Sequence, residues 1–288
     1  MIPQDTETGG LYVIATPIGN LADISPRARQ VLGEVDVIAA EDTRHSRVLL
    51  DHLQVRTPML SLHDHNEEQR VQELLPRMAA GEKVALISDA GTPLMSDPGF
   101  RLVRAAGQAG LPVMAVPGPS AILAALSVAG LATDRFLFEG FLPAKQQARR
   151  KRLEELGRMP CTTVCFESPR RLQATLQDIV ETLGADRECV VARELTKLHE
   201  TVLRGTAGGL AQAYADSEVL HKGEAVLLIE GAQLVSDERV DLPVDQLLLA
   251  LAAELPPRQA ASIAAELTGL RRNDLYARIQ AARPDSVE

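Results

Sequence analysis

The chain of 288 residues is long enough for two domains, and its 45% hydrophobic and 24% charged residues are typical of a globular protein. No apolar run approaches the ~20 residues of a membrane-spanning helix, and the polar, acidic first ten residues do not resemble a signal peptide, so no membrane protein is expected. The net charge of −9 argues weakly against a free-standing nucleic-acid-binding protein.

The cysteines are three in number, at positions 161, 165 and 189, and their spacing matches no recognised metal site. Buried free thiols in a reducing compartment are the simplest interpretation of such a set. Together with the absence of a signal peptide, this interpretation predicts a cytoplasmic protein.

Short apolar runs alternate with helical patterns over the first half of the chain. Ser25-Pro26 and Asp97-Pro98 are typical helix starts, with an N-cap residue followed by proline. A further helix begins at Asn66 and ends near Gly81. The alternation predicts a mostly parallel sheet with helices on both faces. The predicted strands are residues 11–16, 35–40, 84–88 and 113–116.

After about residue 130 the pattern changes to a second α/β region with a mixed sheet. Helices are expected around Leu153 and over residues 169–183, and a polar break follows at residues 236–239. Residues 242–283 have helical spacing with a breaker at Pro256-Pro257. The predicted strands are residues 136–141, 162–166, 190–192, 201–203 and 225–230. The predicted domains are an N-terminal α/β domain (1–130), a second α/β domain (131–235) and a C-terminal helical appendage (240–288).

Three loops that follow predicted strands, residues 16–20, 89–99 and 117–120, are rich in proline and small residues. Glycine lets backbone amides approach a ligand, and proline fixes the loop shape before binding. Any one of these loops alone could be an ordinary tight turn. No G-x-G-x-x-G follows the first strand and no G-K-[ST] occurs, which disfavours NAD and ATP. A nucleoside without phosphates, such as S-adenosylmethionine, fits these loops better.

The segments TPIGNLADIS, AEDTRHSRVLL, SDAGTPLMSDPGF and VPGPSA resemble those of the tetrapyrrole methylase superfamily. The segments SLHDHNE, FEGFLP, FESPRR, ARELTKLHET and GEAVLLIEG are similar to the branch that methylates a cytidine ribose 2'-hydroxyl in bacterial small-subunit (16S) ribosomal RNA. The resemblance runs from residue 11 to about residue 276. It implies two α/β domains of the tetrapyrrole methylase type, S-adenosyl-L-methionine in the cleft between them, a small C-terminal helical appendage and a homodimer.

Cofactor contacts can be carried over by position from the superfamily. Thr92 stands where relatives that act on tetrapyrroles have an aspartate, and Glu167-Ser168 replaces a frequent Met-Gly. The cofactor-binding residues that the resemblance implies are Pro17, Gly19, Asp89, Ala90, Gly91, Thr92, Ser96, Pro117, Gly118, Ser120, Phe166, Ser168, Leu195, Thr196 and Ala225.

Three charged residues are candidates for catalysis. A ribose hydroxyl must lose its proton as the methyl group transfers, and a general base would accelerate that step about 10²–10⁴-fold. Asp42 and Glu194 are candidates for a base or an orienting group, and Lys197 for holding the ribose or a phosphate. Asp42 is equally a helix N-cap candidate, and Glu194 and Lys197 could form a structural ion pair. The pattern around His63 and His65 lacks further ligands, so no metal is expected.

The run KQQARRKR is the most basic segment of the chain and predicts an RNA-phosphate contact, with a solvated helix start as the alternative. The expected partner is small-subunit ribosomal RNA within the assembled subunit, because an acidic enzyme needs that subunit, rather than naked RNA, to position its substrate. Arg271-Arg272 is a weaker candidate for the same contact. The alternative functions are methylation of a corrin or sirohaem intermediate and non-catalytic ribosome binding. The RNA-binding candidates are Lys145, Arg149, Arg150, Lys151 and Arg152.

Overall fold

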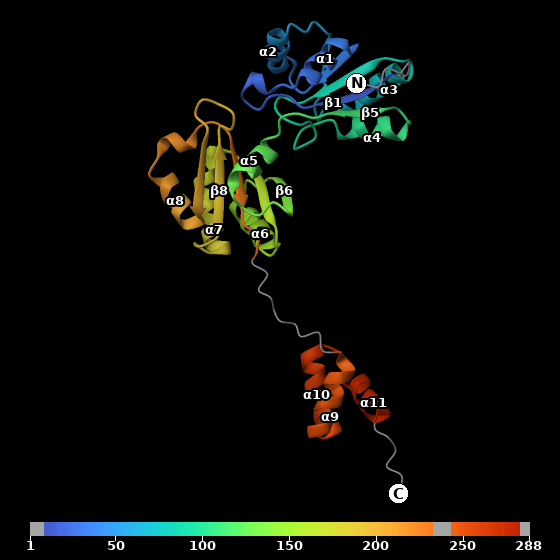
Figure 1. Cartoon of the computed structure of the whole chain (residues 1–288), viewed down its shortest axis with the longest axis vertical. Helices are drawn as coiled ribbons and strands as arrows, with labels where there is room; N and C mark the ends of the chain where they lie inside the picture. Colours follow the sequence, from blue (N-terminus) through green and yellow to red (C-terminus); the bar gives the residue numbers. More distant parts are fainter. Residues whose placement is uncertain (1–8, 233–242, 283–288) are drawn as a thin grey trace. The chain divides into compact units, whose positions relative to one another are not determined.

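The computed structural model of the protein describes residues 9–232 and 243–282. The chain divides into two compact units, Met1–Ala232 and Gln233–Glu288. The first unit holds two five-stranded sheets that follow each other along the chain (Figure 1). The predicted polar break at residues 236–239 lies outside the described residues. The predicted domain limits of 1–130, 131–235 and 240–288 remain a prediction.

The first sheet is wholly parallel, with strand order β3-β2-β4-β1-β5, which confirms the predicted parallel sheet. Helices α1 and α2 share one apolar cluster with the sheet, and α3 and α4 share another on the opposite face. The elements are β1 (Gly10–Ile14), the short 3-10 helix η1 (Leu21–Asp23), α1 (Pro26–Glu34), β2 (Val37–Ala40), α2 (Thr43–Leu53), β3 (Met59–Ser61), α3 (Glu67–Ala79), β4 (Lys83–Ile87), α4 (Phe100–Gln108) and β5 (Val113–Val116).

The starts of α1 and α4 differ in how well the sequence predicts them. The Ser25 hydroxyl accepts a hydrogen bond from the Ala28 amide at 3.0 Å, and α1 begins at Pro26 as predicted. The expected start of α4 at Asp97-Pro98 is wrong, because the helix begins at Phe100. The buried Glu67 carboxylate supplies the cap instead, since its Oε1 accepts hydrogen bonds from the amides of Gly99 (3.1 Å) and Arg101 (2.7 Å). Asp97 is therefore not used as a cap.

The second sheet has the order β6-β7-β10-β8-β9, with β6 parallel to β7 and the other pairs antiparallel, so the mixed sheet is confirmed. Helices α6, α7 and α8 pack on one face, and α5 packs on the other. The elements are α5 (Ala121–Ala129), β6 (Phe136–Phe141), α6 (Gln146–Leu156), β7 (Thr162–Glu167), α7 (Pro169–Leu183), β8 (Glu188–Arg193), β9 (Thr201–Thr206), α8 (Ala207–Ala215), the 3-10 helix η2 (Glu218–His221) and β10 (Ala225–Ile229).

The described part of the second unit, residues 243–282, forms three helices: α9 (Val244–Glu254), α10 (Pro257–Thr268) and α11 (Arg272–Ala282). Pro257 occupies the first position of α10, where its missing N–H costs nothing, so the predicted breaker lies between two helices as expected. Three alanines of α10 are buried against Leu248, Leu275 and Ile279, and their small size allows close helix packing. The predicted helical appendage is confirmed.

All three cysteines are free; Cys165 and Cys189 are buried and Cys161 is half-buried. Burial raises the pKa of the Cys189 thiol to about 12 and that of Cys165 further, so both thiols stay protonated at neutral pH. Within residues 9–232 and 243–282, no helix has the length and apolar character needed to cross a bilayer. In the same described ranges, no three His, Cys, Asp or Glu side chains are grouped to hold a metal ion.

Candidate functional site

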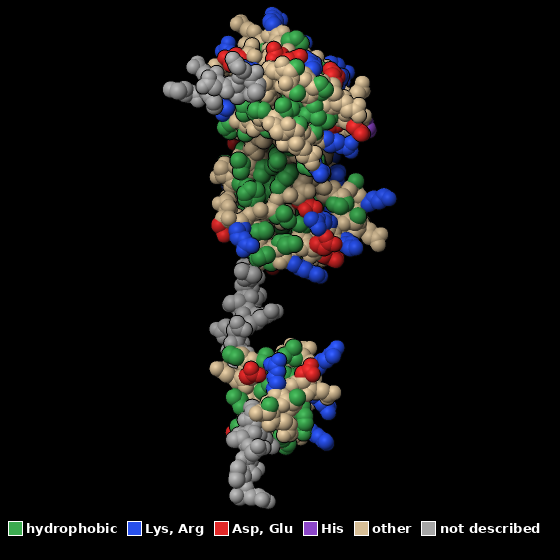
Figure 2. All heavy atoms as spheres, turned by 90° about the vertical axis from the view of Figure 1, so that its right-hand side faces the viewer, with side chains coloured by type: hydrophobic (Ala, Val, Ile, Leu, Met, Phe, Trp, Pro, Cys, Tyr) green, Lys and Arg blue, Asp and Glu red, His purple; other side chains and the backbone are tan. Residues whose placement is uncertain are grey.

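A pocket of about 480 Å³ lies between the two sheets of the first unit. It is formed by the loops at the carboxyl ends of β2 and β4, the start of α5, and the facing ends of β6, β7, β8 and β10. The space-filling view shows a hollow with mainly hydrophobic side chains between the two α/β halves (Figure 2). A volume of this size suits a nucleoside-sized ligand.

Ten of the fifteen cofactor residues expected from the sequence line this pocket. The loops therefore converge as the strand-end argument requires. The ten are Asp89, Ala90, Gly91, Thr92, Ser96, Ser120, Phe166, Ser168, Leu195 and Ala225. The other five, Pro17, Gly19, Pro117, Gly118 and Thr196, are not among the lining residues.

Backbone contacts join the three predicted loops. Thr16 and Gly91 exchange two backbone hydrogen bonds of 2.9 and 3.0 Å, and the Thr92 hydroxyl donates to the Pro119 carbonyl at 3.1 Å. Gly91 has a φ of +82°, and a Cβ there would lie 3.3 Å from the Ile18 side chain. The conformation therefore favours glycine, and the space for a Cβ is tight.

The residues outside the lining set pack directly behind it. A Cβ on Gly19 would lie 2.5 Å from the Lys197 side chain, and one on Gly118 would lie 3.2 Å from the Ala15 Cβ. The Thr196 hydroxyl is buried without a hydrogen-bond partner in the described structure. A larger residue at Gly19 or Gly118 would therefore force these neighbours to shift.

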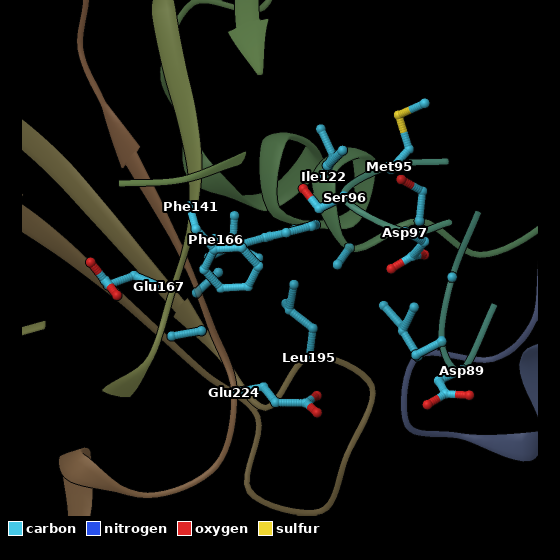
Figure 3. A pocket seen from close by; sticks show the side chains of 18 of the residues that line it. Asp89, Met95, Ser96, Asp97, Ile122, Phe141, Phe166, Glu167, Leu195 and Glu224 are labelled. Carbon is cyan, nitrogen blue, oxygen red and sulfur yellow. The ribbon is translucent and has the colours of Figure 1, made fainter. Parts of the chain in front are cut away.

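Three carboxylates on the first-sheet side, Glu41, Asp89 and Asp97, line the pocket and form what we call the first wall. Figure 3 shows Asp89 and Asp97 of this set. The Asp89 carboxylate accepts a hydrogen bond from the Asp42 amide at 3.0 Å. Burial, with a smaller contribution from Asp89, raises the pKa of Asp97 to about 6. Burial together with the charges of Asp89 and Asp97 raises the pKa of Glu41. Within the described ranges, no cation forms an ion pair with these three carboxylates.

The second wall, on the second-sheet side, consists of Glu167, Glu194 and Glu224. The Lys197 ammonium donates to Glu194 at 3.1 Å and to Glu224 at 2.8 Å. Burial would raise the pKa of Glu194, but the Glu224 amide and the Lys197 ammonium outweigh it and lower this pKa. Burial would likewise lower the pKa of Lys197, but the two glutamates raise it. The pair is therefore held in its charged form.

Glu167 is the deepest carboxylate of the second wall, with a fully buried side chain. It accepts hydrogen bonds from the Thr175 hydroxyl at 2.9 Å and the Ser168 amide at 2.8 Å. The Arg171 guanidinium lies 3.3 Å away and also donates to the Leu142 carbonyl. Glu167 thus ties the start of α7 to the end of β6.

Aromatic rings line the side of the pocket opposite Asp97 (Figure 3). The centroid of Phe166 lies 5.0 Å from that of Phe138 and 5.6 Å from that of Phe141. Phe141 is 59% exposed, which is unusual for a phenylalanine that already has aromatic neighbours. Flat apolar surface of this kind suits the ring of a nucleobase.

Asp42 does not line the pocket but serves as the N-cap of α2. Its Oδ1 accepts a hydrogen bond from the Arg44 amide at 2.9 Å, and the Arg44 guanidinium binds the same carboxylate at 2.8 Å. The Arg44 hydrogen bonds hold the pKa of Asp42 well below its usual range. The N-cap interpretation of Asp42 is confirmed, and its role as a base or orienting group stays a prediction.

The predicted RNA-binding run forms α6, and most of its cations already have partners. Arg149 is 5% exposed and its guanidinium lies 2.6 Å from the buried Asp178 carboxylate. This burial corrects the expectation that Arg149 contacts RNA phosphates, because the run has an inward face. Arg150 binds Asp178 and Glu181, and Arg152 binds Glu139 and Glu155. In the described structure, Lys145 and Lys151 are exposed and form no ion pair.

Several lining residues were missed by the motif argument, above all Asp97, Phe141 and Glu224. Asp97 was assigned to a helix cap, although it belongs to the same quoted segment as Gly91. Phe141 lies in the FEGFLP segment, where an apolar residue at a strand end gives no local signal of a ligand. Glu224 precedes a buried strand and resembles an ordinary turn residue.

A family model described as Tetrapyrrole (Corrin/Porphyrin) Methylases matches residues 10–211, and one described as RsmI C-terminal HTH domain matches residues 238–283. Two proteins named Ribosomal RNA small subunit methyltransferase I are similar to this chain. The one from Xylella fastidiosa (strain Temecula1) is 50% identical over 93% of this chain and 98% of its own length. The one from Escherichia coli O157:H7 is 48% identical over 94% of this chain and 95% of its own.

The fold is shared with a solved structure, uroporphyrin-III C-methyl transferase from Thermus thermophilus complexed with S-adenyl homocysteine. The TM-score is 0.54 at 20% identity, over 77% of this chain and 97% of that one. Since a family model covers more than half of the residues and near full-length relatives share about half of them, the chain belongs to the tetrapyrrole methylase family.

Proposed function

We propose that this protein is an S-adenosylmethionine-dependent methyltransferase that methylates the 2'-hydroxyl of a cytidine ribose in small-subunit (16S) ribosomal RNA. The observation that carries the proposal is the pocket between the two sheets, in a chain that is about 50% identical to the named relatives over nearly its whole length. The proposal places the enzyme in the cytoplasm, where ribosomal subunits are made in bacteria.

The residues of the pocket fit S-adenosylmethionine. The glycine at position 91 leaves space that a Cβ would fill, and Phe166 with Leu195 offers apolar surface for an adenine ring. We propose that the loops at residues 16–20, 89–99 and 117–120 hold the cofactor with Ser168, Thr196 and Ala225. When bound, the cofactor supplies an activated methyl group on a sulfonium centre, and a positively charged centre is favoured beside the acidic first wall.

The charged residues around the second wall are proposed to position the substrate. Lys197 is held as an ammonium by Glu194 and Glu224, so it suits binding of a ribose oxygen or a phosphate better than accepting a proton. Glu194 orients Lys197, and Asp42, which follows β2 on the first-sheet side, orients the start of α2. Holding the ribose in line with the methyl group would itself contribute a large part of the rate.

RNA phosphates are proposed to contact the outer face of α6. Lys145 and Lys151 are the exposed, unpaired cations of that face in the described structure, while Arg150 and Arg152 would have to exchange carboxylate partners for phosphates. The chain carries a net charge of −9, so we propose the assembled subunit, rather than naked RNA, as the substrate. A role of Arg271 and Arg272 in this contact remains a weaker proposal.

A homodimer is also proposed, because closed two-fold dimers are the commonest oligomers of soluble enzymes. Light scattering at working concentration is expected to give twice the chain mass of 31.1 kDa. A single-chain mass under those conditions would contradict the dimer without affecting the proposed reaction.

The reaction itself is tested with radiolabelled S-adenosylmethionine and small subunits purified from cells that lack the gene. We expect label in a 2'-O-methylcytidine after digestion to nucleosides, with assembled subunits labelled better than naked 16S RNA. Uroporphyrinogen and cobalt-free corrin precursors serve as competing acceptors. Label in a tetrapyrrole, or no label in RNA under any condition, would contradict the proposed function.

A further inference from the structure

We infer that Asp97 is the residue that accepts the proton of the acceptor hydroxyl during methyl transfer. This inference rests on the proposed function, because it assumes that the acceptor is a ribose hydroxyl bound in the pocket between the sheets. Asp97 lines that pocket on the side opposite Phe166 (Figure 3). It is not among the three residues that the sequence suggested as catalytic, Asp42, Glu194 and Lys197.

The other carboxylates of the pocket are committed to structural bonds. Glu167 accepts hydrogen bonds from Thr175 and Ser168, and Glu194 accepts them from the Glu224 amide at 2.7 Å and from Lys197. A carboxylate that already binds a cation or two N–H groups holds an added proton poorly. Such groups are weak proton acceptors at neutral pH.

The carboxylates of the first wall bind no cation in the described structure and accept fewer hydrogen bonds: Asp89 accepts the Asp42 amide, Glu41 the Asp89 amide and Asp97 the Ser88 hydroxyl. Glu41 and Asp97 both face the pocket, and in the part of the chain that the structure describes neither forms an ion pair with a cation. Glu41 is attached directly to the end of β2, whereas Asp97 lies on a loop of unusual conformation. The conformation of that loop is the reason to choose Asp97 over Glu41 as the proton acceptor.

The backbone around Asp97 is held in a conformation that ordinary residues avoid. Leu94 and Ser96 have φ values of +76° and +71°, and Gly99 has +119°. Such conformations are unfavourable for non-glycine residues and persist where the surroundings impose them. Here the buried Glu67 carboxylate fixes the end of the loop through the Gly99 and Arg101 amides. The loop therefore presents Asp97 to the pocket in a fixed position.

The surroundings of Asp97 also set its proton affinity. The charged groups that face Asp97 are Asp89, which follows β4, and Glu41, which follows β2. The charge of Asp64, which follows β3, raises the pKa of Glu41 in turn. A hydrogen bond from Ser88 opposes these effects, and burial is the largest of them; the resulting pKa is about 6. A base with this pKa is ionised at neutral pH yet binds a proton much more tightly than an exposed aspartate.

The proposed step balances without a further reactant. The ribose oxygen forms a bond to the methyl carbon, the carbon–sulfur bond breaks, and its electron pair stays on sulfur as a thioether. The proton of the hydroxyl moves to the Asp97 carboxylate. After release of the products the carboxylic acid returns the proton to water, because its pKa lies below neutral pH.

The first test compares Asp97→Asn with the matched control Asp64→Asn in single-turnover methyl transfer at saturating cofactor and small subunits. Asp64 is an exposed neighbour outside the pocket lining. Loss of a general base should slow Asp97→Asn at least ~10²-fold, while Asp64→Asn stays within about threefold of the wild type. Calorimetry should show near-normal cofactor binding by both variants. A normal rate at saturation with weakened cofactor binding would overturn the inference and make Asp97 a cofactor ligand.

The second test reads the ionisation of Asp97 without any reaction. A ¹³C-NMR titration of aspartate carboxyls in the free enzyme should contain one resonance that titrates near pH 6 and is absent from Asp97→Asn. The wild-type single-turnover rate should rise tenfold per pH unit below pH 6 and level off above it, and the residual rate of Asp97→Asn should lose this inflection. A resonance that titrates near pH 4, or a variant that keeps the inflection, would overturn the inference. If wild type does not methylate small subunits at all, the proposed function fails instead.

Discussion

Both walls of the pocket contain carboxylates, but their surroundings shift the carboxylate pKa in opposite directions. In the first wall, burial and neighbouring carboxylates raise the pKa of Glu41 and Asp97. In the second wall, an amide and an ammonium lower the pKa of Glu194. The difference shows that a carboxylate in a pocket is not informative by itself; its partners decide whether it can move a proton or only holds another group in place.

The division continues behind the second wall, where arginines and carboxylates of the second sheet's helices are joined in pairs. Arg149 and Arg150 share Asp178, and Arg152 binds Glu139. Figure 2 shows Lys or Arg side chains lying beside Asp or Glu side chains on this half of the first unit. We therefore attribute structure to these paired charges and chemistry to the acids of the first wall, which bind no cation in the described structure.

The largest loss of stability is expected on breaking the buried pair of Arg149 and Asp178. Asp178→Ala removes a fully buried carboxylate and leaves Arg149, with 6% of its side chain exposed, without its partner. Removing one member of a buried pair costs about 3–5 kcal/mol, so the free energy of unfolding measured in urea should fall by that amount. Glu181→Ala, which removes the exposed partner of Arg150, should cost less than about 1 kcal/mol. Equal losses in the two variants would show that the buried pair is not structural.

Gly91→Val tests whether the loops between the walls form the cofactor site. Valine at a φ of +82° is strained, and its side chain would approach Ile18. Cofactor affinity measured by calorimetry should fall at least ~100-fold, about 2.7 kcal/mol, with or without a chelator. Gly33→Ala in α1 is the control, since nothing lies within 4 Å of the added Cβ. Normal affinity in Gly91→Val would place the cofactor elsewhere, and loss of wild-type binding on chelation would reveal a metal.

Lys197→Met separates a role in substrate binding from a role in proton transfer. The ammonium contributes a charge-assisted hydrogen bond to substrate, worth about 1.5 kcal/mol, so KM for small subunits should rise about tenfold. The single-turnover rate at saturation should change less than threefold, and Glu194→Gln should show a milder form of the same pattern. A ~10²-fold slower saturated rate in either variant, or in Asp42→Asn, would move the catalytic base away from the first wall.

The smallest effect is expected at the outer face of α6. Lys145→Gln with Lys151→Gln should reduce the slope of log K against log salt for subunit binding by about 1.4–1.8, which corresponds to two phosphate contacts. Arg29→Gln with Arg104→Gln removes two exposed cations from α1 and α4 and should leave the slope unchanged. If both double variants behave alike, α6 makes no specific contact with RNA.

The sequence predicts much of this fold because its strands carry local signals. Apolar runs at residues 113–116 and 136–141 coincide with β5 and β6, although both strands are only partly buried, and Pro169 marks the start of α7. Strand β3 was missed because it has only three residues, all half-buried, and so presents neither a long apolar run nor an alternating pattern.

The site was predicted less completely than the fold for a physical reason. Loops at strand ends can be located by their glycines and prolines, which act locally. The burial of Arg149 depends on Asp178, 29 residues away, and the cap of α4 depends on Glu67, 32 residues from Gly99. Contacts of this length leave no periodic pattern in the chain, so Asp97 was assigned to a cap that another residue supplies.

The account is tested most directly by mass mapping of 16S ribosomal RNA from cells that lack the gene. We predict that one cytidine loses its 2'-O-methyl group, that the wild-type gene restores it, and that genes carrying Asp97→Asn or Gly91→Val do not, although both proteins accumulate. An unchanged methylation map in the deletion strain, or full restoration by both variants, would contradict the central claim that this pocket methylates a ribose of small-subunit RNA.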